Sequence, residues 1–348
     1  MNSLSNQPPH LVLTIDVEED MPDWKITPET TTRNVEALVE FADSMAEMGL
    51  RPTYLCNYPV VTQSRSADVL REVIEIAACE FGSHMHAWNT PPHNNKREQG
   101  LAWRGDPYYE SELELETFRA KLLSLHQAVS DVAGRAPTSY RAGRFGVEGK
   151  ALLEIAAQGY RVDSSVIPLS EHVLDGGPDH RGAPQGPYFP SDENVARPGK
   201  LPILEVPISI GLTRRLPEFL RRAFVHTPRW TRLRGLLSSD FLGWIDYGWL
   251  YPARFDTKTM CGVASTLVGS GIPVLNVFLH SSELVAGASG RIKTSADVNN
   301  LRAQLDAVLK HCITNLGAVP TTLTEFADLA NPAGSPPSGA EPRPDGKA

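Results

Sequence analysis

Between His10 and Leu329 the sequence alternates short apolar runs with longer segments of helical periodicity, and this alternation constrains the fold more than any other feature. The first pair is "HLVLTID" followed by "TTRNVEALVEFADSMAEMGL", and similar pairs continue to the closing "TTLTEFADL". Strands that alternate with helices build parallel sheets covered by helices. We therefore predict a single α/β domain over residues 10–330, a distorted barrel of about seven β/α units, with an open doubly wound sheet as the alternative.

The two ends of the chain lack the residues that build a core. Residues 1–9 are polar and residues 331–348 are rich in Pro, Gly and Ser, so we predict that both are disordered. The N-terminus has no basic region followed by an apolar core, and no apolar run reaches the roughly 18 residues that cross a bilayer. We therefore expect a cytoplasmic protein.

The net charge of -8 argues against general binding to nucleic acid. The four cysteines lack metal-like spacing, so we expect them to be reduced thiols.

One stretch reverses the sign of the charge. The segment from Arg214 to Arg234 contains several arginines and a single acid, Glu218, and its apolar residues lie at helical spacing. We predict that residues 211–240 form a basic inserted helical segment. It could make a peripheral membrane contact through anionic head groups, or bind the phosphates of a nucleotide-linked or lipid-linked sugar. The alternative is a helical pair whose arginines are solvated.

Polar residues at strand ends are the candidates for chemistry, because the active site of either architecture lies at the carboxyl ends of its strands. Asp16 and Glu18 end the first strand, and side chains two residues apart in an extended segment point the same way. One carboxylate could bind a divalent cation while the other accepts a proton; the alternative is a solvated loop. His84 and His86 in "EFGSHMHAW" repeat this spacing, and together with the acids they indicate a metal site.

Two other strand ends carry candidates of a different kind. Arg141 in "SYRAG" could hold a carboxylate through a bidentate pair, or form no more than an ion pair at the barrel rim. His280 ends "VFLH" and could donate a proton to a leaving group.

Taken together and in this order, these segments resemble the polysaccharide deacetylase family, which includes metal-dependent chitin and peptidoglycan deacetylases. The resemblance runs from about Leu11 to Leu284 and rests on "TIDVE", "SHMHAW", "SYRAG", "YRVDSSVIP" and "FLHSSEL". It implies the distorted barrel, with Asp16 as general base and Glu18 as metal ligand in the variant whose two acids are one residue apart. The usual His-x-x-x-His motif is absent, since the fourth residue after His84 is Trp88.

The resemblance also implies roles for the remaining residues. His84 and His86 complete the metal site, with His93 as an outside candidate for the second imidazole. Arg141 orients Asp16, and His280 is the general acid. The residues that we expect to contact substrate are Tyr58, Trp88, Asp163 and Ser164. The acids beyond the site, Glu19, Asp20 and Asp23, are expected at the rim or at a helix start.

The function that follows from the resemblance is hydrolysis with a divalent metal ion, for which we expect zinc. The substrate would be a small-molecule, nucleotide-linked or lipid-linked sugar that loses an acyl group, in the first place N-acetyl. A cyclic-amide hydrolase of the allantoinase kind, sometimes active without metal, is one alternative. A catalytically inactive barrel that binds glycan is the other.

Overall fold

The first strand, β1 (His10–Val17), divides its side chains between two environments, and this division sets the architecture. Leu11, Leu13 and Ile15 pack outward in the main apolar core, whereas Val12 and Thr14 face the opposite side. The computed structural model describes residues 7–23, 30–76, 78–93, 108–215 and 247–331. A strand buried on both faces is typical of a parallel sheet covered by helices.

The described residues form a parallel sheet of eight strands. Around it run β9 (Val274–His280), β1, β2 (Thr53–Cys56), β3 (Glu80–Met85), β4 (Ser139–Ala142), β5 (Val162–Asp163) and β6 (Leu204–Glu205). The eighth, β10 (Val319–Pro320), pairs with the start of β1. A separate antiparallel pair consists of β7 (Ile210–Leu212) and β8 (Tyr247–Trp249).

Irregular segments close the gap between β6 and β9. The Ser209 backbone N–H donates to the carbonyl of Asn276 at 3.2 Å, and the Asn276 N–H donates to Ser209 Oγ at 2.8 Å. Beside them, the Phe278 N–H donates to the carbonyl of Leu250 at 2.9 Å. The sheet therefore curls into a barrel, which confirms the predicted distorted barrel of β/α units.

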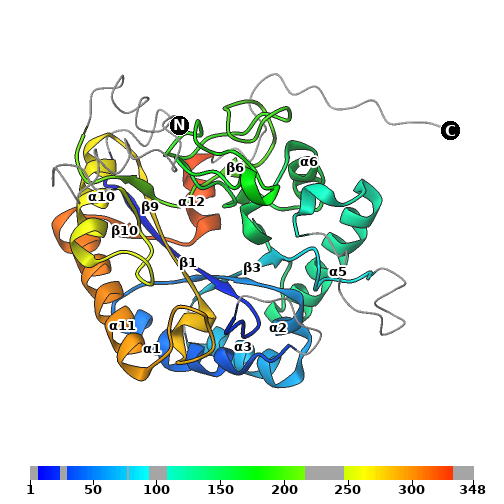
Figure 1. The fold of residues 1–348 in the computed structure, drawn as a ribbon, viewed down its shortest axis with the longest axis horizontal. Helices are drawn as coiled ribbons and strands as arrows, with labels where there is room; N and C mark the ends of the chain where they lie inside the picture. Colours follow the sequence, from blue (N-terminus) through cyan, green and yellow to red (C-terminus); the bar gives the residue numbers. More distant parts are fainter. Residues whose placement is uncertain (1–6, 24–29, 77, 94–107, 216–246, 332–348) are drawn as a thin grey trace.

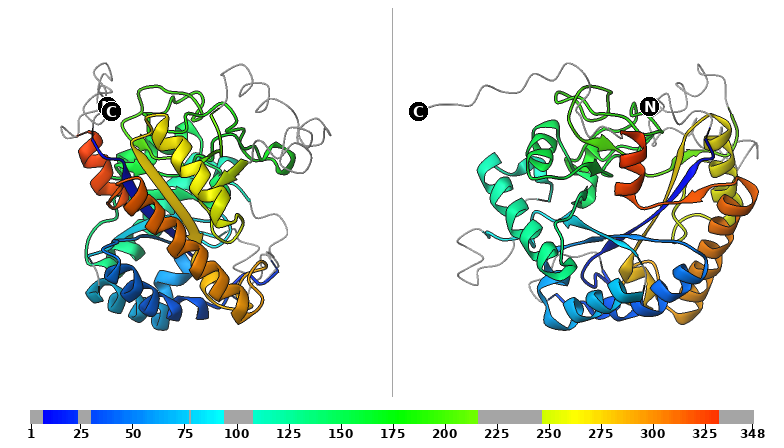
Figure 2. Two further views of the ribbon diagram at one scale, coloured as in Figure 1. Left: turned by 90° about the vertical axis from the view of Figure 1, so that its left-hand side faces the viewer. Right: turned by 180° about the vertical axis from the view of Figure 1, so that it is seen from behind.

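Helices surround the curved sheet and cover its outward-facing apolar residues (Figure 1). They are α1 (Leu38–Glu47), α2 (Tyr58–Thr62), α3 (Ser64–Ile76), α5 (Leu115–Ala133), α6 (Gly149–Ala157), α10 (Thr257–Gly269) and α11 (Ser295–Lys310). Figure 2 shows α10 and α11 running alongside β9. Short helical turns are η1 (Arg33–Ala37), η2 (Glu110–Glu112), η3 (Gly143–Phe145), η4 (Val173–Asp175), η5 (Ser281–Leu284) and the π-helical η6 (His311–Asn315).

The last helix, α12 (Leu323–Ala330), fills the amino-terminal end of the barrel. Its Leu323 and Phe326 pack in one apolar cluster with Val12 of β1 and Leu55 of β2, and Phe326 also contacts the ring of His10 at 5.4 Å. Because this end of the barrel is packed with apolar side chains, the opposite, carboxyl end is left for a polar site.

The ends and the basic segment lie largely outside the described residues. Of the predicted helical segment 211–240, residues 211–215 are described; Gly211 and Leu212 belong to strand β7, which pairs with β8, and Arg214 and Arg215 are exposed. At the N-terminus, the Pro9 carbonyl accepts a hydrogen bond from the Val319 N–H at 2.8 Å. All four cysteines are free thiols, as expected. Within the described ranges, no helix combines the length and hydropathy that crossing a bilayer requires.

Candidate active site

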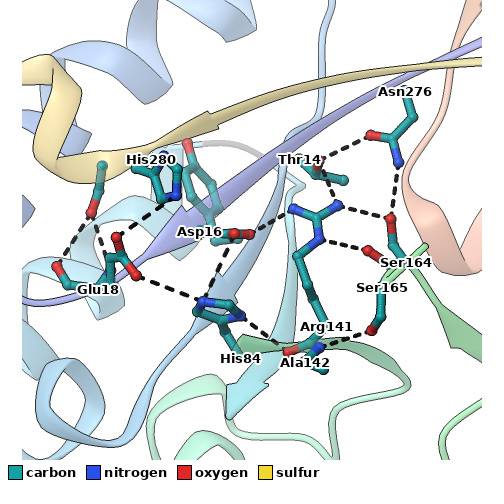
Figure 3. A network of polar contacts seen from close by, with 12 residues as sticks. Thr14, Asp16, Glu18, His84, Arg141, Ala142, Ser164, Ser165, Asn276 and His280 are labelled. Carbon is teal, nitrogen blue, oxygen red and sulfur yellow. Dashed lines mark hydrogen bonds and ion pairs between the residues drawn. The ribbon is translucent and has the colours of Figure 1, made fainter. Parts of the chain in front are cut away.

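The register of the parallel strands brings the predicted site residues together. Asp16 on β1 pairs with His280 on β9, and His84 on β3 pairs with Arg141 on β4. Residues at the same register of neighbouring parallel strands project to the same face. Four segments far apart in the sequence therefore converge at the carboxyl end of the barrel (Figure 3).

Glu18, His84 and His86 place three potential metal-ligand atoms within 4.8 Å of one another, and all three side chains are buried. Glu18 Oε2 lies 3.4 Å from His86 Nε2 and 3.7 Å from His84 Nε2. The two Nε2 atoms are 2.9 Å apart. His84 and His86 lie together, as their spacing predicted, and Asp16 and Glu18 line the same cavity; His93 is not part of the cluster.

The chemistry of this cluster suits a divalent metal ion. His84 Nδ1 lies 3.0 Å from the Arg141 carbonyl, which places a hydrogen on Nδ1 and leaves the Nε2 lone pair toward Glu18. Burial, with the charges of His84, His280 and Arg144, lowers the pKa of His86 well below its usual value and keeps that imidazole neutral. Among the described residues, buried Glu18 Oε1 has no hydrogen-bond partner. Two imidazoles and one carboxylate are a ligand set that catalytic zinc uses.

Asp16 is held as an anion beside this cluster. Arg141 Nη1 donates to Asp16 Oδ1 at 2.6 Å, and Asp16 Oδ2 lies 3.8 Å from His84 Nε2. Burial alone would raise the pKa of Asp16, but the charges of Arg141, His84 and His280 outweigh it and lower that pKa. Asp16 is therefore ionised at neutral pH, as a general base must be.

Arg141 is completely buried, and a layer of polar side chains inside the barrel fixes it. Its Nε donates to the Ser164 carbonyl at 2.8 Å, and its Nη2 donates to Ser164 Oγ at 2.8 Å and to Thr14 Oγ1 at 3.0 Å. Asn276 joins this layer by accepting from Thr14 Oγ1 at 2.9 Å and donating to Ser164 Oγ at 3.0 Å. The guanidinium therefore cannot rotate away from Asp16 without breaking several buried hydrogen bonds.

Asp163 and Ser164 do not line the cavity: Ser164 lies beside Arg141 inside the barrel, and Asp163, at the register of Tyr140, lies on the outer face of the sheet. Both are fully buried and absent from the cavity lining. Ser164 positions the guanidinium. Asp163 Oδ1 accepts a hydrogen bond from Ser165 Oγ at 2.5 Å, and Ser165 Oγ in turn accepts one from the Ala142 N–H. Burial raises the pKa of both Asp163 and its neighbour Glu205. These residues support β4 and β5 and lie away from solvent.

His280 lies on the other side of Glu18, with a carboxylate and a phenol behind it. Its Nε2 is 3.8 Å from Glu18 Oε1, and its Nδ1 is 3.2 Å from the Tyr251 hydroxyl and 3.5 Å from Glu283 Oε1. Tyr251 donates to Glu283, which also accepts from the His280 N–H at 3.0 Å. Burial lowers the pKa of His280, but the charges of Glu18 and Glu283 outweigh it and raise the pKa to about 9. His280 is therefore protonated at neutral pH, as a general acid must be.

Replacing Glu283 with glutamine is expected to move the alkaline limb of the rate profile to lower pH. The variant keeps the shape of the side chain but removes one of the two main charges that raise the pKa of His280; Glu18, the larger one, remains. The acid form is therefore lost at a lower pH. The measurement is kcat/KM against pH. Tyr251→Phe keeps the Glu283 charge and should shift the alkaline limb less. An alkaline limb at the same pH in Glu283→Gln and wild type would contradict the role of Glu283 in raising the pKa of His280.

These groups open into a cavity of about 390 Å³ with aromatic walls. Its lining includes Asp16, Glu18, His84, His86 and His280, together with Trp88, Tyr108, Phe145, Trp249, Tyr251 and Phe278. Trp88 stacks against His86 with ring centroids 4.2 Å apart, so its predicted place at the site fits the structure. Tyr58 begins α2 and is absent from this lining.

Sequence reasoning missed several residues at this site. Tyr251 and Glu283 support His280, and the second follows it by three residues in "HSSEL". Thr14 and Asn276 were detectable as polar residues inside apolar strand runs. Glu19 is buried, not at the rim as expected, and accepts hydrogen bonds from Asn57 and Asn89 in the loops after β2 and β3. Asp20 does lie at a helix start, where it accepts the Asn34 N–H at 3.1 Å.

Solved structures share the fold of this chain. A "putative glycoside hydrolase/deacetylase" from Parabacteroides distasonis is 14% identical and matches 93% of this chain and 71% of its own, with a TM-score of 0.57. A "putative polysaccharide deacetylase" from Mycobacterium smegmatis is 14% identical over 93% of this chain and 91% of its own, with a TM-score of 0.49. The sequence matches no protein-family model and no curated protein. At such low identity, the first likeness establishes the barrel fold.

Proposed function

We propose that this chain is a metal-dependent hydrolase that removes an acyl group, in the first place N-acetyl, from a sugar or a sugar-containing intermediate. The observation that carries the proposal is the arrangement around Glu18. Two imidazoles lie on one side of it, an anionic Asp16 held by Arg141 lies beside them, and a protonated His280 lies on the other side. Metal-assisted hydrolysis of an amide uses these three functions together: a metal site, a general base and a general acid.

Each residue has a defined part in the reaction. Glu18, His84 and His86 would hold a divalent ion, and this ligand set suits zinc. When bound, the ion would polarise the acyl carbonyl and acidify a water molecule. Asp16 accepts the proton that water loses as its oxygen attacks the carbonyl carbon. His280 donates a proton to the amine as the carbon–nitrogen bond breaks, so a free amine and a carboxylate result. Arg141 holds Asp16 in its ionised, oriented form throughout.

The identity of the substrate is part of the same proposal. The expected cytoplasmic location favours a biosynthetic intermediate over a mature extracellular polymer, and sugars linked to a nucleotide or a lipid are the intermediates that we propose to test. The aromatic walls of the cavity support a sugar substrate, because aromatic faces pack well against apolar ring surfaces.

Metal analysis tests the first half of the proposal. We expect the purified protein to bind one divalent ion per chain and His84→Ala to lose it. Loss of a residue that merely supports a ligand already weakens a metal site by about 10–100-fold, and His84 is itself a proposed ligand. His126→Ala is the matched control, since His126 lies on α5 outside the cluster. Equal metal content in wild type and His84→Ala would contradict the assignment of the ligands.

Release of the acyl group tests the second half. We expect acetate from one or more of a panel of free, nucleotide-linked and lipid-linked N-acetylated sugars, with activity lost to a chelator and restored by zinc. Ring opening of cyclic ureides, with no acetate from any sugar, would favour the cyclic-amide alternative. No hydrolysis of any compound, with retained binding of sugars, would favour the inactive glycan-binding barrel.

A further inference from the structure

Glu19 follows the proposed metal ligand Glu18 directly in the chain, but it is turned toward other partners. Its side chain is buried and does not line the cavity. Asn89 Nδ2 donates to Glu19 Oε1 at 2.9 Å and to Oε2 at 3.1 Å, and Asn57 Nδ2 also donates to Oε2. Both oxygens of the carboxylate therefore bind asparagines from two other segments of the chain.

The two asparagines follow the strands β2 and β3. Asn57 comes directly after β2, and its backbone N–H donates to the carbonyl of Val17, the last residue of β1, at 3.0 Å. Asn89 lies in the turn after β3, where its backbone N–H donates to the His86 carbonyl at 3.3 Å. Both asparagine side chains are buried. Glu19 thus links the carboxyl ends of three consecutive strands.

This link matters because β1 and β3 do not pair with each other. The sheet order places β2 between them, so the backbone ladder does not join the segment of Glu18 to the segment of His86. The hydrogen bonds between Glu19 and Asn89 connect these two segments directly. Each of the two bonded residues lies within three positions of a proposed metal ligand.

The position of His86 depends on its turn more than that of His84 does. His84 lies within β3 at the register of Arg141, and its Nδ1 binds the Arg141 carbonyl. His86 lies one residue beyond the end of β3, and among the described residues its buried Nδ1 has no hydrogen-bond partner. Trp88 stacks on the His86 ring, but it belongs to the same turn and so does not fix that turn relative to β1.

We propose that Glu19 is a positioning residue of the metal site. By holding Asn89 it fixes His86 relative to Glu18, and it thereby strengthens binding of the ion without contacting it. The inference rests on the proposed function, since it gives Glu19 a role only through the site of Glu18, His84 and His86. A site whose ligands are already in place binds more tightly, because little of the binding free energy is used to order them.

The zinc dissociation constant, measured by competition with a chromophoric chelator, tests this role. Asn89→Ala removes both hydrogen bonds to Glu19 oxygens without changing the charge. We expect it to raise the dissociation constant about tenfold, the lower end of the usual cost of losing a group behind a metal ligand. Glu19→Gln should also weaken binding, but it removes a negative charge as well. Equal dissociation constants for Asn89→Ala and wild type would overturn the proposal.

A reciprocal double variant tests the same link by rescue. Glu19→Gln combined with Asn89→Asp exchanges donor and acceptor and keeps the net charge: the new amide can donate to the new carboxylate while its oxygen accepts from Asn57. It should recover most of the affinity lost in Glu19→Gln. A double variant that binds zinc as weakly as Glu19→Gln would contradict the role of the link. If Asn89→Ala does not fold, this comparison decides.

Glu80→Gln is the matched control for a general loss of stability. Glu80 is also a buried glutamate, but it begins β3 at the opposite end of the barrel, where it accepts from the Thr324 N–H at 2.9 Å and from Thr324 Oγ1 at 2.7 Å. Its loss should lower the melting temperature of the metal-free protein and leave the zinc dissociation constant unchanged. Zinc binding weakened as much in Glu80→Gln as in Asn89→Ala would refute the positioning role.

The wild type separates this inference from the proposed function. A wild type that binds zinc and releases acetate, with variants that bind zinc equally well, would retain the hydrolase and refute the role of Glu19. Variants that bind zinc more weakly than a wild type that releases no acyl group would retain the role of Glu19 and refute the hydrolase. A wild type that binds no divalent ion would refute both.

Discussion

Replacing Asp16 with asparagine is expected to lower kcat for acyl release by about 10²–10⁴-fold, the usual contribution of a positioned general base. The variant keeps the size of the side chain and an oxygen that can accept from Arg141, but it cannot take a proton from water at neutral pH. The measurement is the rate of acetate release from the best sugar of the panel, with metal content determined on the same samples.

Asp20→Asn is the matched control for this change. Asp20 lies four residues away and accepts hydrogen bonds from Thr31 and Asn34, outside the cavity lining. It should therefore keep activity close to that of wild type. An Asp16→Asn variant that retains both its metal and its full rate would remove Asp16 from the role of base.

The pH dependence of the wild type follows from the same residue. Because the folded-state pKa of Asp16 is lowered, Asp16 stays ionised at pH values below the usual pKa of an aspartate. We therefore expect kcat/KM to fall only as the pH drops through that lowered pKa. The protonated His280 acid sets the opposite limb, with activity falling as the pH rises through about 9.

Replacing Arg141 with methionine is expected to lower the free energy of unfolding by about 3–5 kcal/mol, because it leaves the Asp16 carboxylate buried without its partner. Arg141 is 0% exposed and its guanidinium makes four hydrogen bonds, to Asp16, Thr14 and both oxygens of Ser164. The measurement is urea denaturation of the chelator-treated protein, so that metal binding does not contribute.

A double variant separates the buried charge from the lost packing. Arg141→Met combined with Asp16→Asn should recover much of the stability, because no uncompensated carboxylate is then buried. Arg119→Met is the control, since Arg119 on α5 is solvent-exposed and its ion pair with Glu154 on α6 should contribute little. A single variant as stable as wild type, or a double variant as unstable as Arg141→Met, would contradict this account.

The sequence predicted the barrel and most of the candidate site because both depend on local periodicity. The alternation of apolar and helical segments determined the order of strands and helices, and the two-residue spacing in "TIDVE" and "SHMH" placed each pair on one face. The parallel sheet then requires that these pairs meet, since all carboxyl ends of its strands lie at the same end. That is why Asp16, Glu18, His84, His86, Arg141 and His280 could be named without a structure.

Only the tertiary structure decided what lies behind and around these residues. Ser164 was assigned to the substrate groove because it follows a strand, but its hydroxyl binds the Arg141 guanidinium inside the barrel. Asp163, at the register of Tyr140 and Glu205, faces the outer side of the sheet. Tyr251 supports His280 from a segment 29 residues away, and the aromatic residues of the cavity wall come from several segments far apart in the sequence. Contacts of this kind depend on how loops pack across the barrel, and no local pattern in the sequence records that packing.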